Sequence, residues 1–188
     1  MNNPNKLTVL RIIMVPLFMF FMLTDFVPYT GLFALLIFAL ASLTDMIDGK
    51  LARKYNQITD FGKFLDPLAD KMLVTAALVC FVQMGLTDAW VCMIIIAREF
   101  LVTSLRLVAA GGGKVIAASI WGKVKTVSQL ISIITVILLH ELQAMAVIPA
   151  TVPVPVISDI LLWICAILTL FSGATYMWQH RDYIDVKK

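Results

Sequence analysis

Residues 42–71 read SLTDMIDGKLARKYNQITDFGKFLDPLADK and hold Asp45, Asp48, Asp66 and Asp70 at fixed spacings. The pattern is Asp-x2-Asp-Gly-x2-Ala-Arg-x8-Gly-x3-Asp-x3-Asp. If both halves are helical, Asp45 and Asp48 lie on one helix stripe, because a helix turns once every 3.6 residues. Asp66 and Asp70 lie on a stripe of a second helix. Two helices that face each other along these stripes would bring the four carboxylates together.

Four neighbouring carboxylates repel one another unless cations lie between them. Their hard oxygen atoms suit Mg²⁺, Mn²⁺ or Ca²⁺ rather than zinc. Gly49, Ala52 and Gly62 are small, so a second backbone or a ligand could approach closely. The alternative is a solvated helix face, which is the more common origin of such charges in a soluble protein.

The composition argues against the solvated face. Of the 188 residues, 61% are hydrophobic and 14% are charged, and the mean hydropathy is +0.93. Soluble domains contain about 25% charged residues. We therefore expect an all-α integral membrane protein with residues 1–188 as one domain and no nucleic-acid partner. The three cysteines lie in apolar runs without metal-ligand spacing, so we expect small core residues.

Six apolar stretches are long enough to cross about 30 Å of hydrocarbon as helices. They run approximately over residues 7–26, 30–54, 61–84, 89–110, 119–139 and 156–178. A mixed loop with three prolines is expected over residues 140–155. The first stretch is too long for the core of a signal peptide and no small-residue cleavage site follows it, so we expect no removable signal.

The basic residues lie in alternate connections. Lys and Arg flank the second-to-third and fourth-to-fifth connections and both termini, whereas the other connections carry Asp25, Asp88, His140 and Glu141. The positive-inside rule then places both termini and the aspartate pattern on the cytoplasmic side.

Asp45 is expected to lie within the membrane. It precedes Arg53 by eight residues, so it lies about 12 Å deeper along a helix. A carboxylate at that depth is costly unless it lines a wet cavity or binds an ion, and such residues are usually functional.

The pattern from Asp45 to Asp70 resembles the signature of the CDP-alcohol phosphotransferases, and every defining position is matched. Three other segments resemble the bacterial members that use sn-glycerol 3-phosphate. They are PNKLTVLRIIMVP at residues 4–16, AREFLVTSLR at residues 97–106 and GKVKT at residues 122–126. The resemblance covers the whole chain and implies the six-helix transmembrane fold of that family.

The resemblance implies an activity, which is transfer of a phosphatidyl group from CDP-diacylglycerol to sn-glycerol 3-phosphate with release of CMP. It implies two divalent cations, Mg²⁺ or Mn²⁺, held by Asp45, Asp48 and Asp66, with Asp70 as a further ligand. It also implies that Asp70 is the catalytic base that takes the proton of the acceptor hydroxyl.

The donor is expected to lie against the first half of the pattern. Gly49, Ala52 and Arg53 match the family positions that meet the CDP group, and Gly62 is grouped with them as a donor-binding residue. The resemblance further implies a multi-pass protein of the bacterial inner membrane, a cytoplasmic active site, contact with membrane lipid and a homodimer.

An acceptor with its own phosphate requires a second, basic pocket. The candidate ligands are Arg98, Arg106, Lys123 and Lys125. Arg98 is the one basic residue deep inside an expected span, and it has two interpretations. It either forms an internal ion pair with Glu99 or a pattern carboxylate, or reaches the substrate phosphate.

Two other functions remain as alternatives. A related family member could use phosphatidylglycerol, inositol phosphate or serine as the acceptor. A divalent-cation transporter also uses carboxylates inside the membrane, but it typically places them near the midplane and within inverted repeats. Here the aspartates lie toward one face and no repeat is visible.

Overall fold

The protein is all-helical in the computed structural model, which describes residues 3–24, 26, 28–55, 60–111, 119–179 and 181. Within these ranges there are six helices and no strand. Their bounds are α1 Asn3–Leu23, α2 Thr30–Tyr55, α3 Asp60–Gln83, α4 Ala89–Gly111, α5 Ile120–Ala144 and α6 Val154–Gln179. The all-α prediction is confirmed.

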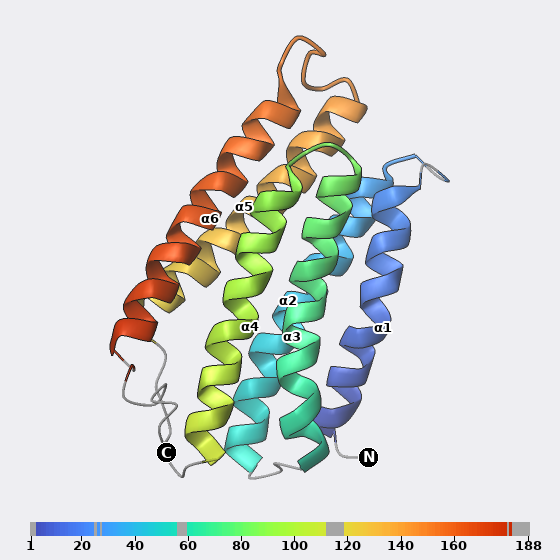
Figure 1. Ribbon diagram of the computed structural model, residues 1–188. Coiled ribbons are helices and arrows are strands. Elements are labelled where there is room, and N and C mark those ends of the chain that lie inside the picture. The colour runs from blue at the N-terminus through green and yellow to red at the C-terminus, as the bar shows by residue number, and fades with distance from the viewer. Residues whose placement is uncertain are drawn as a thin grey trace.

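Successive helices run in opposite directions through one bundle (Figure 1). Helix α1 packs against α2 and α3, helix α6 packs against α4 and α5, and contact between α2 and α5 joins the two groups. Helix α2 ends and α3 begins at the lower end of Figure 1, which we call the motif end. Both halves of the aspartate pattern therefore belong to the same end of the bundle.

Helix α5 ends later than the sequence indicated. It continues to Ala144, so the prediction that residues 140–144 belong to a loop is wrong. The physical reason is Glu141, whose buried carboxylate accepts a hydrogen bond of 3.1 Å from the backbone N–H of Gly31. Gly31 lies in the first turn of α2, where N–H groups lack partners within the helix and favour a negative charge. This contact stabilises the last turns of α5.

Gly31→Ala is expected to destabilise the bundle. A Cβ atom at Gly31 would collide with the carboxylate of Glu141, whose Cδ atom would lie only 3.0 Å away. Forcing extra atoms into a packed site costs about 1–3 kcal/mol. Gly111→Ala is the matched control, because nothing lies within 4 Å of the added methyl group. Denaturation in detergent should show a lower free energy of unfolding than the wild type for Gly31→Ala but not for Gly111→Ala. Equal free energies of unfolding for the two variants would contradict the contact.

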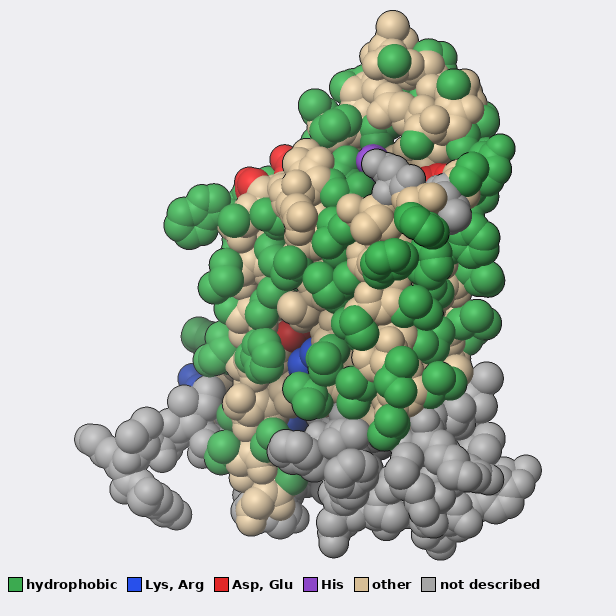
Figure 2. Space-filling view, turned by 90° about the vertical axis from the view of Figure 1, so that its right-hand side faces the viewer, with side chains coloured by type: hydrophobic (Ala, Val, Ile, Leu, Met, Phe, Trp, Pro, Cys, Tyr) green, Lys and Arg blue, Asp and Glu red, His purple; other side chains and the backbone are tan. Residues whose placement is uncertain are grey.

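The core is apolar and the outer faces of the helices are apolar as well. Phe18 and Phe38 meet in the core with ring centroids 5.8 Å apart, and both are fully buried. Large apolar side chains are exposed on every helix, including Leu10, Leu36, Val79, Leu107, Ile131 and Ile167. Figure 2 shows such side chains over most of the described surface on one face. A bundle in water would instead present polar outer faces.

Two helices are long and apolar enough to cross a membrane, judged by length and composition among the described residues. They are α5, with 25 residues and a hydropathy of 1.5, and α6, with 26 residues and a hydropathy of 2.3. The apolar segments of the first three helices are shorter and cover Thr8–Leu23, Thr30–Thr44 and Lys71–Gln83.

Candidate active site

The aspartate pattern lies on the two helices that meet at the motif end. Asp45 and Asp48 belong to the second half of α2, and Asp66 and Asp70 to the first half of α3. Both segments are helical, as the stripe argument requires, and α2 contacts α3. The side chains of residues 45–67 and of Asp70 lie outside the described residues, so their roles as ligands or base stay predictions.

The donor set of the pattern fits a divalent cation. Four carboxylates supply hard oxygen ligands, which suit Mg²⁺ or Mn²⁺. Among the side chains that the structure describes, no three His, Cys, Asp or Glu residues gather as a metal site. The pattern is therefore where we expect a cation to bind. The predicted donor-binding residues Gly49, Ala52 and Arg53 lie on α2, and Gly62 lies on α3, in the same undescribed set of side chains.

Glu99 on α4 joins two of the four predicted phosphate ligands. Its Oε1 atom accepts a hydrogen bond of 3.1 Å from Arg98 and a second from the ammonium group of Lys125 on α5. Lys125 is only 2% exposed. A buried cation is tolerated when a carboxylate pairs with it, so Glu99 explains how Lys125 can lie inside an apolar bundle.

Arg98 also reaches the last helix. Its second terminal nitrogen donates a hydrogen bond of 2.7 Å to the hydroxyl oxygen of Ser172 on α6. The neighbouring Gly173 leaves room for the arginine, since a Cβ atom there would lie 2.9 Å from the Cγ atom of Arg98. The ion pair with Glu99 is one of the two alternatives that the sequence offered for Arg98. Its contact with a substrate phosphate stays a prediction.

Arg106 lies eight residues further along α4, toward the motif end. Its Nε atom donates a hydrogen bond of 3.1 Å to the hydroxyl oxygen of Tyr176, and its guanidinium carbon lies 5.3 Å from the centre of that ring. This stacking holds the side chain on α6 through cation–π attraction. Arg98 and Arg106 therefore contact successive turns of the same helix.

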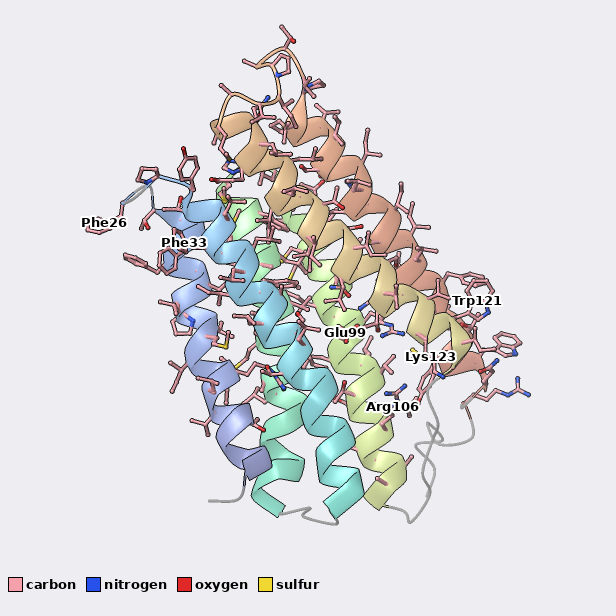
Figure 3. The ribbon with its side chains drawn as sticks, turned by 180° about the vertical axis from the view of Figure 1, so that it is seen from behind. Phe26, Phe33, Glu99, Arg106, Trp121 and Lys123 are labelled. Carbon is pink, nitrogen blue, oxygen red and sulfur yellow. The ribbon has the colours of Figure 1, made fainter. Side chains whose placement is uncertain are left out.

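The two lysines at the start of α5 face different surroundings. Ser119 caps the helix by accepting a hydrogen bond of 3.1 Å from the N–H of Gly122, which fixes the first turn. Lys123 is exposed, whereas Lys125 is buried against Glu99. The structure thus brings Lys125 and Arg98 together and leaves Lys123 on the surface. Figure 3 shows Glu99, Arg106 and Lys123 in the part of the bundle nearer the motif end.

A cavity of about 60 Å³ adjoins the Glu99 cluster. It lies between α3, α4 and α5, and its polar lining includes Lys71, Glu99, Lys125 and Gln129. Lys71 directly follows Asp70 on α3, so the cavity begins immediately beyond the aspartate pattern.

Four of the residues around this basic cluster were not singled out from the sequence as site residues. They are Lys71, Gln129, Ser172 and Tyr176. Gln129 carries a signal that could have revealed it, because an amide in the middle of an apolar stretch needs a buried partner. Tyr176 carried no such signal, since a tyrosine near the end of an apolar helix is common at a membrane interface.

Residues 1–172 match the protein family described as CDP-alcohol phosphatidyltransferase. The chain belongs to the CDP-alcohol phosphatidyltransferase family. The matched range contains every candidate site residue named from the sequence, and Tyr176 lies just beyond it. Membership in this family is the expectation that the aspartate pattern raised, and it is confirmed.

Curated relatives align along nearly the whole chain. A Bacillus subtilis protein is 45% identical over 96% of both chains. A Rickettsia bellii protein is 35% identical over 97% of both chains, and a Haemophilus influenzae protein is 37% identical over 94% of this chain and 91% of its own. All three bear the name CDP-diacylglycerol–glycerol-3-phosphate 3-phosphatidyltransferase.

Proposed function

We propose that this protein transfers the phosphatidyl group of CDP-diacylglycerol to sn-glycerol 3-phosphate, giving phosphatidylglycerol phosphate and CMP. The observation that carries the proposal is the 45% identity, over 96% of both chains, to a relative named for this reaction. The aspartate pattern and the basic residues supply the chemistry that the reaction needs, one for each phosphate-bearing substrate.

The reaction forms one phosphorus–oxygen bond and breaks another. The acceptor hydroxyl oxygen attacks the phosphorus that bears diacylglycerol, the bond to the CMP oxygen breaks, and CMP leaves with that electron pair. Asp70 accepts the proton of the hydroxyl as a general base. Asp45, Asp48 and Asp66, with Asp70, would hold divalent cations, which supply positive charge to the phosphoryl oxygens.

The second pocket receives the acceptor. Arg106 and Lys123 lie nearer the motif end, and Lys125 and Arg98 lie deeper beside Glu99. Arginine suits a phosphate because its planar group donates two parallel hydrogen bonds, and lysine acts as a point charge. Gly49, Ala52, Arg53 and Gly62 are assigned to the donor.

We further propose that residues 1–188 form one transmembrane domain with six spans in the bacterial inner membrane, the motif end facing the cytoplasm. The exposed apolar side chains on all six helices support this placement, as does the basic character of the connections at that end. The homodimer implied by the family resemblance would be tested by the mass of the purified protein in detergent, and a monomer would contradict it.

One assay tests both the reaction and its sidedness. Sealed membrane vesicles containing the protein receive CDP-diacylglycerol and a water-soluble acceptor, and lipid products are identified by mass. We expect phosphatidylglycerol phosphate and CMP from inverted vesicles with external sn-glycerol 3-phosphate, and little product from right-side-out vesicles. Product from serine or inositol phosphate instead, or from phosphatidylglycerol supplied in the vesicle membrane, would reassign the acceptor, and the opposite sidedness would overturn the orientation.

A further inference from the structure

Gln129 on α5 is a buried polar side chain whose amide nitrogen has no hydrogen-bond partner among the described residues. The residue is 3% exposed. An unpaired buried donor costs about 1–3 kcal/mol. Such groups are rare in native proteins and usually meet a water, an ion or a ligand. Gln129 lines the cavity of about 60 Å³, and a turn of its buried amide would point this donor into that cavity.

The walls of this cavity are rich in hydrogen-bond donors. Lys71 and Lys125 contribute ammonium groups, Thr75 contributes a hydroxyl and Gln129 contributes its amide. Glu99 is the one carboxylate among the described residues of the lining, and its oxygen already accepts hydrogen bonds from Arg98 and Lys125. An ammonium group has three donors, so Lys125 keeps others after pairing with Glu99. Hydrogen-bond donors and positive charges therefore outnumber the carboxylates in the described lining, which suits an anion with several oxygen atoms.

The cavity also has the right position for an acceptor. Lys71 follows Asp70 directly, and Thr75 lies about one turn further along α3. Lys125 and Gln129 lie one turn apart on α5 and face α3 and α4 across the cavity. A small molecule with one end in the cavity could therefore extend back toward the residue assigned as the base.

We propose that this cavity receives the terminal phosphate of sn-glycerol 3-phosphate and that Gln129 determines specificity by donating a hydrogen bond to that phosphate. The inference rests on the proposed function and refines its acceptor site, because Lys125 lines the cavity. Arg98, Arg106 and Lys123 do not line it and would act from outside it. A monoester phosphate is a compact group that can enter a cavity of this size. The phosphodiester of phosphatidylglycerol carries a substituent on each side and cannot. Gln129 and the cavity thereby select a monoester acceptor over a lipid acceptor.

Gln129→Met tests the role of the amide. Methionine is similar in length but has no N–H donor. We expect the KM for sn-glycerol 3-phosphate to rise about tenfold, which is the loss of one hydrogen bond to a charged group. The KM for CDP-diacylglycerol should change little. The melting temperature should not fall, because an unpaired buried donor has been removed.

Thr169→Val is the matched control. Thr169 on α6 is fully buried, its hydroxyl has no hydrogen-bond partner among the described residues, and it does not line the cavity. This variant also removes an unpaired polar group from the bundle, and both KM values should stay unchanged. Inorganic phosphate serves as a probe of the phosphate group alone. It should compete with sn-glycerol 3-phosphate in the wild type, and about tenfold less strongly in Gln129→Met.

The outcomes separate this inference from the proposed function. If the wild type uses sn-glycerol 3-phosphate but Gln129→Met leaves its KM and phosphate inhibition unchanged, the cavity holds only water and the inference is wrong. If both KM values rise together and the melting temperature falls, Gln129 has only a structural role and the inference is again wrong. If the wild type makes no product from sn-glycerol 3-phosphate, the proposed function fails first and the inference with it.

Discussion

Asp70→Asn is expected to abolish turnover while leaving CDP-diacylglycerol binding largely intact. The carboxamide keeps the shape of the side chain and still offers one oxygen to a cation, but it cannot take a proton from the acceptor hydroxyl. General-base catalysis contributes about 10²–10⁴-fold, so kcat should fall at least a hundredfold. Steady-state kinetics give kcat, and equilibrium binding of labelled CDP-diacylglycerol gives the donor affinity.

Asp60→Asn is the control for this experiment. Asp60 is the first residue of α3 and carries the same chemical change, but it lies outside the spaced aspartate pattern. It should retain nearly wild-type turnover. A kcat for Asp70→Asn within a few-fold of the wild type would remove Asp70 from the role of base. An equal loss of donor affinity and turnover would instead make it chiefly a metal ligand.

The helices could be predicted from the sequence because their signal is local. Apolar stretches separated by turn residues and charges indicate helix positions to within a few residues at most ends. The end of α5 was missed because the contact that explains it is not local. Glu141 reads as a loop residue in sequence, yet it lies buried where its carboxylate accepts the N–H of Gly31, 110 positions away.

The aspartate pattern indicated the family because the family signature is defined by the spacing of its residues along the chain, and that spacing can be seen in the sequence alone. The basic site could be predicted less completely. Residues two positions apart on a helix point in nearly opposite directions, so Lys123 and Lys125 could not lie on the same face of α5. Helical geometry alone could have separated them. The burial of Lys125 could not be foreseen, because it depends on how α4 and α5 pack around Glu99.

Glu99 explains how the proposed acceptor site can hold buried positive charges. Several positive charges in an apolar bundle would repel one another and would be costly to bury. One carboxylate that pairs with both Arg98 and Lys125 offsets that cost and holds both cations in place before substrate binds. Positive charge fixed in advance binds an anion with less loss of side-chain freedom. The acidic and basic halves of the proposed site would thus be built differently, since the carboxylates of the aspartate pattern are expected to take cations from solution, whereas Arg98 and Lys125 are balanced by Glu99 within the protein.

Removal of divalent cations is expected to eliminate activity, and Asp45→Asn, Asp48→Asn and Asp66→Asn should each do the same. Four neighbouring carboxylates repel one another without a cation, and each asparagine replaces a charged ligand with a weak neutral one. Excess chelator should stop turnover, and added Mg²⁺ or Mn²⁺ should restore it. Mn²⁺ binding followed by electron paramagnetic resonance reports the site independently of activity and should weaken in each variant.

Asp88→Asn is the matched control at the opposite end of the bundle. The Asp88 carboxylate accepts a hydrogen bond of 2.9 Å from the N–H of Val91 at the start of α4, and asparagine can cap a helix equally well. Mn²⁺ affinity and turnover should therefore match the wild type. If the three pattern variants bound Mn²⁺ as tightly as Asp88→Asn, the carboxylates would not be the cation ligands. Full turnover in excess chelator would show in addition that the charge on the phosphoryl oxygens is stabilised by the basic side chains alone.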